Sequence, residues 1–262
     1  MPLDTFMTSM NDIALIAKAR SFAARDCMHS LGFKQWTADT VPMATTNTFK
    51  ELDLVDYPDP ATAAESGYPG ITPRQPLQFD RKPAARSTPT RPDREGIEVL
   101  MGRVAKTKSG LAVPSGGCLE AGDRKIRSAD AETAPEELAV DPRALAADAK
   151  FSALRDSRMQ SANAAWSSCM EQKGLRYADP RAARSDPRWA GRKSEEPASE
   201  EEKRAAEADA TCKQAVNLFG IYKALEAAYQ KVQVGKHASA LVDSTRVFKS
   251  WVENAQRIVA KG

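Results

Sequence analysis

Length, composition and charge give values typical of a globular protein and exclude two large classes. The 262 residues are 42% hydrophobic and 28% charged, and 38 basic residues against 35 acidic ones leave a net charge of +3. So balanced a charge argues against a nucleic-acid-binding protein, which usually carries a clearly basic domain. No apolar run approaches the roughly 18 residues that a membrane-spanning helix needs.

The first predicted element is a helix over residues 8–31. Its apolar residues recur at steps of three and four, which places them on one face of a helix. Gly32 is typical of a residue that follows a helix C-terminus, and we expect Phe33 to fold back onto the last turn. Cys27 therefore lies just over one turn before the predicted end of this helix.

Residues 37–95 are expected to form a long irregular excursion. Nine prolines interrupt any regular element in it, and apolar residues are scattered along it. We expect the excursion to pack at a few points, with residues 80–95 the most mobile part because they are polar, basic and proline-rich. Long loops carried by a rigid scaffold are common places for binding residues, so a partner surface is sought here first.

A short apolar run over residues 96–104 fits either a strand or a helical turn. Gly116 and Gly117 predict a tight bend that delivers Cys118. Beyond it, Thr133 and Glu136 form a capping-box pattern, which predicts the start of a second helical block.

The remaining chain predicts three long helices. The first covers about 142–173, with one possible break, and Gly174 ends it as Gly32 ends the first helix. Ser199 and a glutamate three residues later form a capping box before the next, which Gly235 is expected to close. The last covers about 238–260. We therefore expect a mainly α protein, with residues 133–262 forming an antiparallel helical bundle and residues 1–132 an N-terminal part that packs on it. One continuous domain is the alternative to this division.

The four cysteines have no Cys-x-x-Cys spacing, and the chain has two histidines, so zinc and thioredoxin-type sites are disfavoured. The expected antiparallel helices would bring Cys169 near Cys212, which leaves Cys27 and Cys118 for a second disulfide. The other pairings stay open on sequence grounds, as do four buried free thiols. Cys27 and Cys169 share the pattern Cys-Met-x-x-x-Gly, at residues 27–32 and 169–174.

Four stretches resemble a group of uncharacterised exported proteins and lipoproteins of actinobacteria. They are FAARDCMHSLGF, VPSGGCLEAG, AAWSSCMEQKGLRYADP and EADATCKQAVNLFGIYKALEAAYQK, in that order. The resemblance implies an extracytoplasmic location and paired cysteines at these positions, and it implies no activity, substrate or catalytic residue. No signal peptide precedes Pro2. Because the resemblance is to exported proteins, we expect that a signal peptide has been removed to give this mature chain.

No catalytic, cofactor-binding or metal-binding constellation is predicted. The histidines, His29 and His237, lie outside any nucleophile-elbow motif. Glu120 and Glu226 are the candidate carboxylates of a hydrolase, although a solvated or ion-paired carboxylate is the favoured interpretation of each. The candidate ligand contacts are aromatic residues in irregular or turn-rich chain: Trp36, Tyr57, Tyr68 and Trp189.

These expectations favour a non-enzymatic binding or interaction protein, secreted or in the cell envelope. Its expected partner is a protein or a cell-wall component, with no nucleic acid, no cofactor and no transmembrane segment in this chain. The alternatives are a carboxylate-based cell-wall hydrolase and a structural subunit of a larger extracellular assembly.

Overall fold

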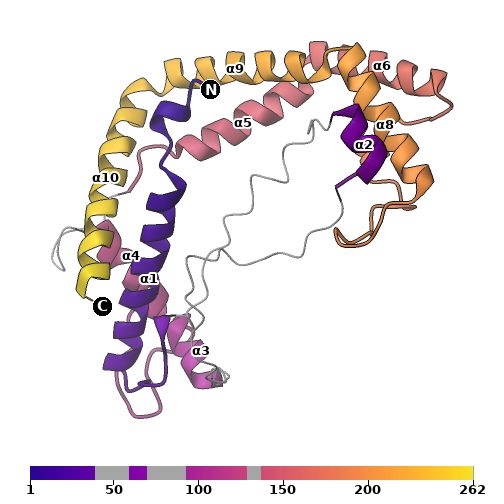
Figure 1. Cartoon of the computed structure of the whole chain (residues 1–262). Helices are drawn as coiled ribbons and strands as arrows, with labels where there is room; N and C mark the ends of the chain where they lie inside the picture. Colours follow the sequence, from indigo (N-terminus) through magenta and orange to yellow (C-terminus); the bar gives the residue numbers. More distant parts are fainter. Residues whose placement is uncertain (39–58, 70–92, 129–136, 262) are drawn as a thin grey trace. The chain divides into compact units, whose positions relative to one another are not determined.

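The computed structural model describes residues 1–38, 59–69, 93–128 and 137–261 of the chain (Figure 1). Within these residues the protein is mainly α, as expected, and no β-strand is present. Of the run at 96–104, residues 96–100 lie in helix α3, and residues 101–104 follow its end. The predicted capping box at Thr133 and Glu136 lies outside the described residues. The elements are a 3₁₀ turn η1 (Asp4–Phe6) and the helices α1 (Met10–Ser30), α2 (Pro60–Ser66), α3 (Arg94–Leu100), α4 (Gly117–Arg127), α5 (Pro142–Arg155), α6 (Ser157–Gln172), α7 (Pro180–Arg184), α8 (Glu200–Ala215), α9 (Leu218–Lys236) and α10 (Ala238–Lys261).

Two of the long predicted helices are each divided in two. Asp156 separates α5 from α6, and its carboxylate accepts a hydrogen bond from the Arg158 amide, which makes it the N-cap of α6. Asn217 separates α8 from α9 with a φ of 51°, a left-handed conformation that ends a helix. Gly235 lies inside α9, which continues to Lys236 instead of ending at the glycine.

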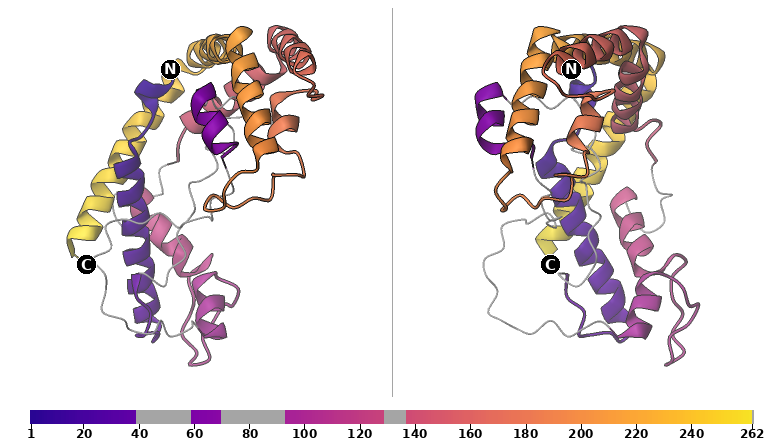
Figure 2. Two further views of the ribbon diagram at one scale, coloured as in Figure 1. Left: turned by 45° about the vertical axis from the view of Figure 1, so that its right-hand side comes forward. Right: turned by 90° about the vertical axis from the view of Figure 1, so that its right-hand side faces the viewer.

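The described residues pack as two compact units. Unit 1 contains Met1–Asp4, residues 59–69 and Arg143–Lys236, and unit 2 contains residues 5–38, 93–128 and 137–142 together with residues 237–261. This grouping differs from the expected division at residue 132, because α2 packs in unit 1 and α10 packs in unit 2. Unit 2 places α1 against α4 and α10, which both views of Figure 2 show.

Both Cys-Met-x-x-x-Gly motifs end a helix in the same way. The methionine carbonyl accepts a hydrogen bond from the amide five residues later: Phe33 to Met28 at 3.0 Å in the first motif, and Leu175 to Met170 at 3.0 Å in the second. The glycine that precedes the donating amide, Gly32 in the first motif and Gly174 in the second, has a φ of 94° and 78°, respectively. This is the Schellman arrangement, in which glycine adopts the left-handed conformation at low cost. The shared sequence is therefore a shared helix C-terminus.

Both expected disulfides are present. Cys27 bonds to Cys118 in unit 2, with Cα atoms 5.5 Å apart, and Cys169 bonds to Cys212 in unit 1, with Cα atoms 5.7 Å apart. No free cysteine remains. The bonds close loops of 91 and 43 residues, worth about 5 and about 4 kcal/mol in the chain-entropy model. The second bond joins the last turns of α6 and α8, a geometry that differs from the expected staple across a helical hairpin.

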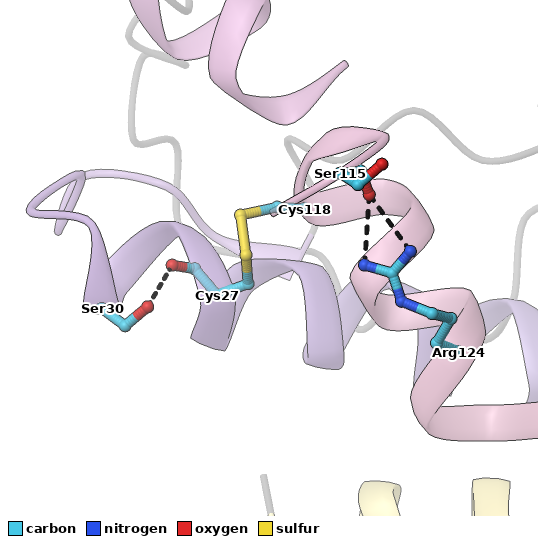
Figure 3. The surroundings of a disulfide bond; sticks show 5 residues. All are labelled: Cys27, Ser30, Ser115, Cys118 and Arg124. Atoms are coloured by element: carbon cyan, nitrogen blue, oxygen red, sulfur yellow. Dashed lines mark hydrogen bonds between the residues drawn. A yellow bond between two sulfur atoms is a disulfide. The ribbon is translucent and has the colours of Figure 1, made fainter. Parts of the chain in front are cut away.

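The Cys27–Cys118 bond joins the last turn of α1 to the first turn of α4 (Figure 3). The Ser30 hydroxyl donates to the Cys27 carbonyl at 2.7 Å, and the Arg124 guanidinium donates twice to the Ser115 carbonyl at 3.1 Å. These contacts fix the backbone on both sides of the bond. Cys118 is fully buried, in a cluster with Met28, Trp36 and Leu100 among others.

Candidate interaction site on helix α8

Residues 59–69, named here the held segment, pack along α8 in unit 1, and α2 lies beside α8 in Figures 1 and 2. The Asp59 carboxylate caps α2 by accepting from the Thr62 amide at 3.1 Å. Ala63 is fully buried in the same cluster as Ala205 and Ala206 of α8. Small side chains at these positions let the two helices approach closely.

The held segment leaves α2 through Gly67, which has a φ of 70°. A Cβ atom at this position would lie 2.6 Å from the Ala198 Cβ and 2.8 Å from Oε1 of Glu202. Both the backbone conformation and the close approach therefore require glycine here. The next residue, Tyr68, is directed into unit 1 and is 5% exposed.

Arg192 and Glu202 form an ion pair, and both side chains also hydrogen-bond to the backbone of Tyr68. Nε and Nη2 of Arg192 each donate to the Glu202 carboxylate at 2.9 Å. The Glu202 carboxylate also accepts from the Tyr68 amide at 3.1 Å, and Arg192 donates to the Tyr68 carbonyl. Both backbone polar groups of Tyr68, its amide and its carbonyl, are thus held by charged side chains. Because Glu202 is 2% exposed, these contacts offset the loss of its hydration.

The Tyr68 ring stacks on Trp189, with centroids 5.9 Å apart and an angle of 22° between planes. Its hydroxyl donates to the Ala205 carbonyl at 3.4 Å. The Trp189 indole donates to the Ala183 carbonyl at 3.0 Å, which fixes the platform on which Tyr68 stacks. Burial, and then the nearby Asp209 carboxylate, raise the pKa of Tyr68, so the phenol stays protonated at neutral pH.

Asp209 is a buried carboxylate beneath this tyrosine, with 1% exposure. It accepts a hydrogen bond from the Trp166 indole at 2.9 Å and pairs with Lys213 at 2.8 Å. Burial raises the pKa of Asp209, while Lys213, Trp166 and Tyr68 act in the opposite direction. The three partners lie in the interior of unit 1 and each interacts with Asp209, which indicates a structural network.

The outer side of α8 carries an open pocket of about 430 Å³. Ala208 and Leu175 supply its apolar lining, and the remaining lining residues are polar or charged: Lys173, Glu201, Arg204, Glu207 and Thr211. Lys173 and Leu175 come from the chain that follows α6, next to the Cys169–Cys212 bond. Basic and acidic groups face one small hollow, which suits a ligand that carries both signs of charge, such as a peptide.

A second polar cluster lies around Trp189. Tyr177 donates to Asp186 at 2.9 Å, and Arg188 pairs with Asp186 at 2.7 Å while its guanidinium lies 4.6 Å from the Trp189 ring centre. Arg188 holds the pKa of Asp186 well below its usual range. Burial, then the bond to Asp186, raises the pKa of Tyr177 to about 12. This cluster fastens the connection between α7 and α8.

The structure brings together two of the four aromatic residues proposed as ligand contacts. Tyr68 and Trp189 stack on one another, and their exposed fractions are 5% each. Trp36 is 3% exposed in the core of unit 2, against Gly96. Tyr57 lies outside the described residues. In this conformation the three described rings contact the protein itself, and a role in binding an external ligand stays a prediction.

The two candidate hydrolase carboxylates are found in different units. Glu120 lies in α4 and pairs with Arg127 at 2.8 Å. Glu226 lies in α9, 2% exposed, where it accepts from Lys223 at 3.0 Å and from Gln230. Gln230 in turn accepts from the Leu3 amide at 3.1 Å. Glu226 therefore acts through Gln230 to hold the N-terminus against unit 1.

Sequence reasoning missed Arg192 and Glu202. Ser199 and Glu202 read as a capping box, and the Glu202 amide does donate to the Ser199 hydroxyl at 3.1 Å. The Glu202 side chain, however, turns inward to Arg192 and Tyr68. The available signal was an arginine ten residues before a glutamate of an alanine-rich helix, a pattern too common to single out. Among the described residues, no group of three or more His, Cys, Asp or Glu side chains is placed to hold a metal ion.

No helix in the described part of the chain is long and apolar enough to cross a membrane. The chain matches no protein-family model, no curated protein and no solved structure.

Proposed function

We propose that this chain is a non-enzymatic interaction protein of the cell envelope that works in an oxidising compartment outside the cytoplasm. The two disulfides support the compartment, since such bonds persist where thiols are not kept reduced. The resemblance to exported actinobacterial proteins points the same way. The partner class is a protein or a cell-wall component.

One observation carries the interaction role: α8 and the connection that precedes it hold a short peptide segment by its backbone. Arg192 and Glu202 bind the carbonyl and the amide of Tyr68, and Trp189 stacks on its ring. Backbone capture combined with an aromatic pocket is a common mode of peptide recognition. The open pocket on the other side of α8 offers further mixed-charge surface to a protein partner.

The catalytic alternative has no comparable support. Glu120 and Glu226 belong to different units, and each is engaged in its own ion pair. The buried Asp209 is enclosed by Trp166 and Lys213. Turnover of a cell-wall glycan that is abolished by Glu120→Gln or Glu226→Gln would overturn the proposal.

Two measurements in the native host test it. Peptide mapping without reductant should find the Cys27–Cys118 and Cys169–Cys212 bonds in the envelope or extracellular fraction, and free thiols there would contradict the compartment. Crosslinking followed by partner identification should recover an envelope component with the wild-type chain. The matched variant Arg204→Glu/Lys173→Glu, which reverses the basic side of the pocket, should recover less of it.

A further inference from the structure

The held segment lies in sequence between two parts of unit 2, residues 5–38 and 93–128, that contact one another. The Gln35 side chain donates to Asp93 at 3.2 Å, and the Trp36 indole lies against Gly96, whose added Cβ would come within 2.7 Å of it. Contacts within unit 2 therefore join the residues that come just before the stretch 37–92 to those that come just after it. Its described part, residues 59–69, packs in unit 1.

The contacts of Gly67 and Tyr68 described above are made with one face of unit 1. That receptor face consists of Trp189, Arg192, Ala198, Glu202, Ala205 and Asp209, and it recognises the two residues by shape, backbone hydrogen bonds and ring stacking. Nothing in these contacts depends on whether the segment and the face belong to the same molecule. The contacts would be identical with the segment of another copy.

The connections on either side of the held segment are long. Residues 39–58 and 70–92 are each roughly 20 residues, and a chain of that length reaches up to about 60 Å when extended. A short connection would compel docking on the same molecule, whereas connections of this length permit docking on a neighbour. Exchange of an identical element between copies requires no new interface chemistry.

We propose that the receptor face binds the held segment of a second copy of this chain, so that two molecules exchange residues 59–69 reciprocally. Tyr68 of one molecule then completes the Arg192–Glu202 site of the other. Docking within one molecule competes with exchange, because a covalent connection between the segment and the face gives an effective concentration on the order of millimolar. Exchange is therefore favoured where copies are locally concentrated. The inference rests on these contacts and does not depend on the compartment proposed above.

Complementation between two variants tests the exchange. Gly67→Ala spoils the held segment, because the new Cβ meets Ala198 and Glu202 and φ is 70°. The double substitution Arg192→Met/Glu202→Leu removes the ion pair of the receptor face. Because both charges are replaced, no buried charge is left without its partner. The first variant has no intact held segment and the second has no intact receptor face. Neither can therefore dock on a copy of itself, and each alone should be a monomer. When mixed, the intact segment of the second variant meets the intact face of the first, and a 1:1 heterodimer should form.

Native mass spectrometry and light scattering report the result at concentrations up to about a millimolar. We expect the dimer fraction of the mixture to exceed that of either variant alone by about tenfold or more, corresponding to 1.4 kcal/mol. Gly191→Ala serves as the matched control for Gly67→Ala, because a Cβ there meets nothing within 4 Å. A mixture of folded variants that contains only monomers overturns the proposal. So does binding of a free peptide of residues 59–69 without a heterodimer, since it would show that the connections forbid exchange.

A measurement on the unaltered protein covers the case in which a variant fails to fold. Heavy-isotope and ordinary copies are mixed at high concentration, incubated and crosslinked. Crosslinks that join residues 59–69 to α8 should include pairs of one heavy and one light peptide. Exclusively heavy–heavy and light–light pairs would show docking within one molecule only, and the exchange would be rejected.

Discussion

Arg192 and Glu202 form a two-pronged ion pair, and each partner also binds the backbone of Tyr68, 124 and 134 residues away in sequence. The arginine side chain is 12% exposed and the glutamate side chain 2%. A buried carboxylate of this kind is stable only while its donors are in place. The pair therefore links the folding of unit 1 to the docking of the held segment.

Loss of the arginine should destabilise unit 1 strongly. Arg192→Ala leaves Glu202 buried without its cation, and we expect unit 1 to lose about 3–5 kcal/mol of unfolding free energy. Hydrogen exchange of the α8 amides measures this loss, because it reports the opening of one unit at a time. In Arg158→Ala the lost pair with Asp156 has an arginine that is 68% exposed, so a much smaller loss is expected. Equal losses in the two variants would contradict the role given to Arg192.

Asp209 and Lys213 should behave as a buried pair in a double-mutant cycle. Asp209→Asn leaves the Lys213 ammonium, which is 6% exposed, without its carboxylate, and about 3–5 kcal/mol should be lost. Adding Lys213→Met removes that ammonium and should recover most of the loss. A double variant as unstable as the single one would contradict the unpaired ammonium as the cause of the loss.

The helix ends followed from the sequence because their causes are local, whereas the pairing of the cysteines spans 91 and 43 residues and stayed open among alternatives. A glycine ends a helix through its own backbone conformation, and the cysteine lies five residues before that glycine in both cases. Both Cys-Met-x-x-x-Gly motifs end a helix in this way. The break at Asn217 was missed because asparagine tolerates a left-handed conformation without requiring it. The α8 site was missed for another reason. Tyr68, Arg192 and Glu202 meet only through the tertiary packing of α2 on α8, and no local spacing records that contact.

The cluster at Asp186 should give stability a dependence on acid. Arg188 lowers the pKa of Asp186 below its unfolded value of about 3.9, so the ionised form is favoured by folding. Its contribution is present above that value and is lost as the pH falls through the lower, folded pKa. Asp186→Asn should remove this part of the acid dependence, which unfolding at a series of pH values below about 5 measures. An unchanged acid profile in the variant would refute this assignment.

Tyr177 should make the same cluster sensitive to alkali. Its pKa of about 12 lies above the unfolded value of about 10, so folding favours the protonated phenol. Its contribution is present below about pH 10 and is lost as the pH rises toward 12. A tyrosine signal that ionises near pH 12 and vanishes in Tyr177→Phe should appear in an ultraviolet titration. In Asp186→Asn the signal should shift to lower pH, although burial of the ring continues to raise it.

The bend that carries Cys118 depends on two glycines in contact. A Cβ at Gly117 would lie 2.2 Å from the Gly102 amide nitrogen and 2.4 Å from the Leu100 carbonyl oxygen, and φ is 74°. Gly117→Ala should therefore displace the first turn of α4 and hinder the Cys27–Cys118 bond. Thiol labelling of the denatured protein should detect two free cysteines in part of the population, and peptide mapping should assign them to this pair.

Gly110→Ala is the matched control for that variant. Gly110 also has a positive φ, of 87°, but a Cβ there meets nothing within 4 Å. Alanine at residue 110 should thus cost only the backbone strain, about 1–3 kcal/mol, and should leave both disulfides formed. If the two variants label equally, strain alone governs this loop and the close contact between Gly102 and Gly117 has no separate role. If only Gly117→Ala exposes thiols, the seating of Cys118 depends on two backbones approaching where no side chain fits.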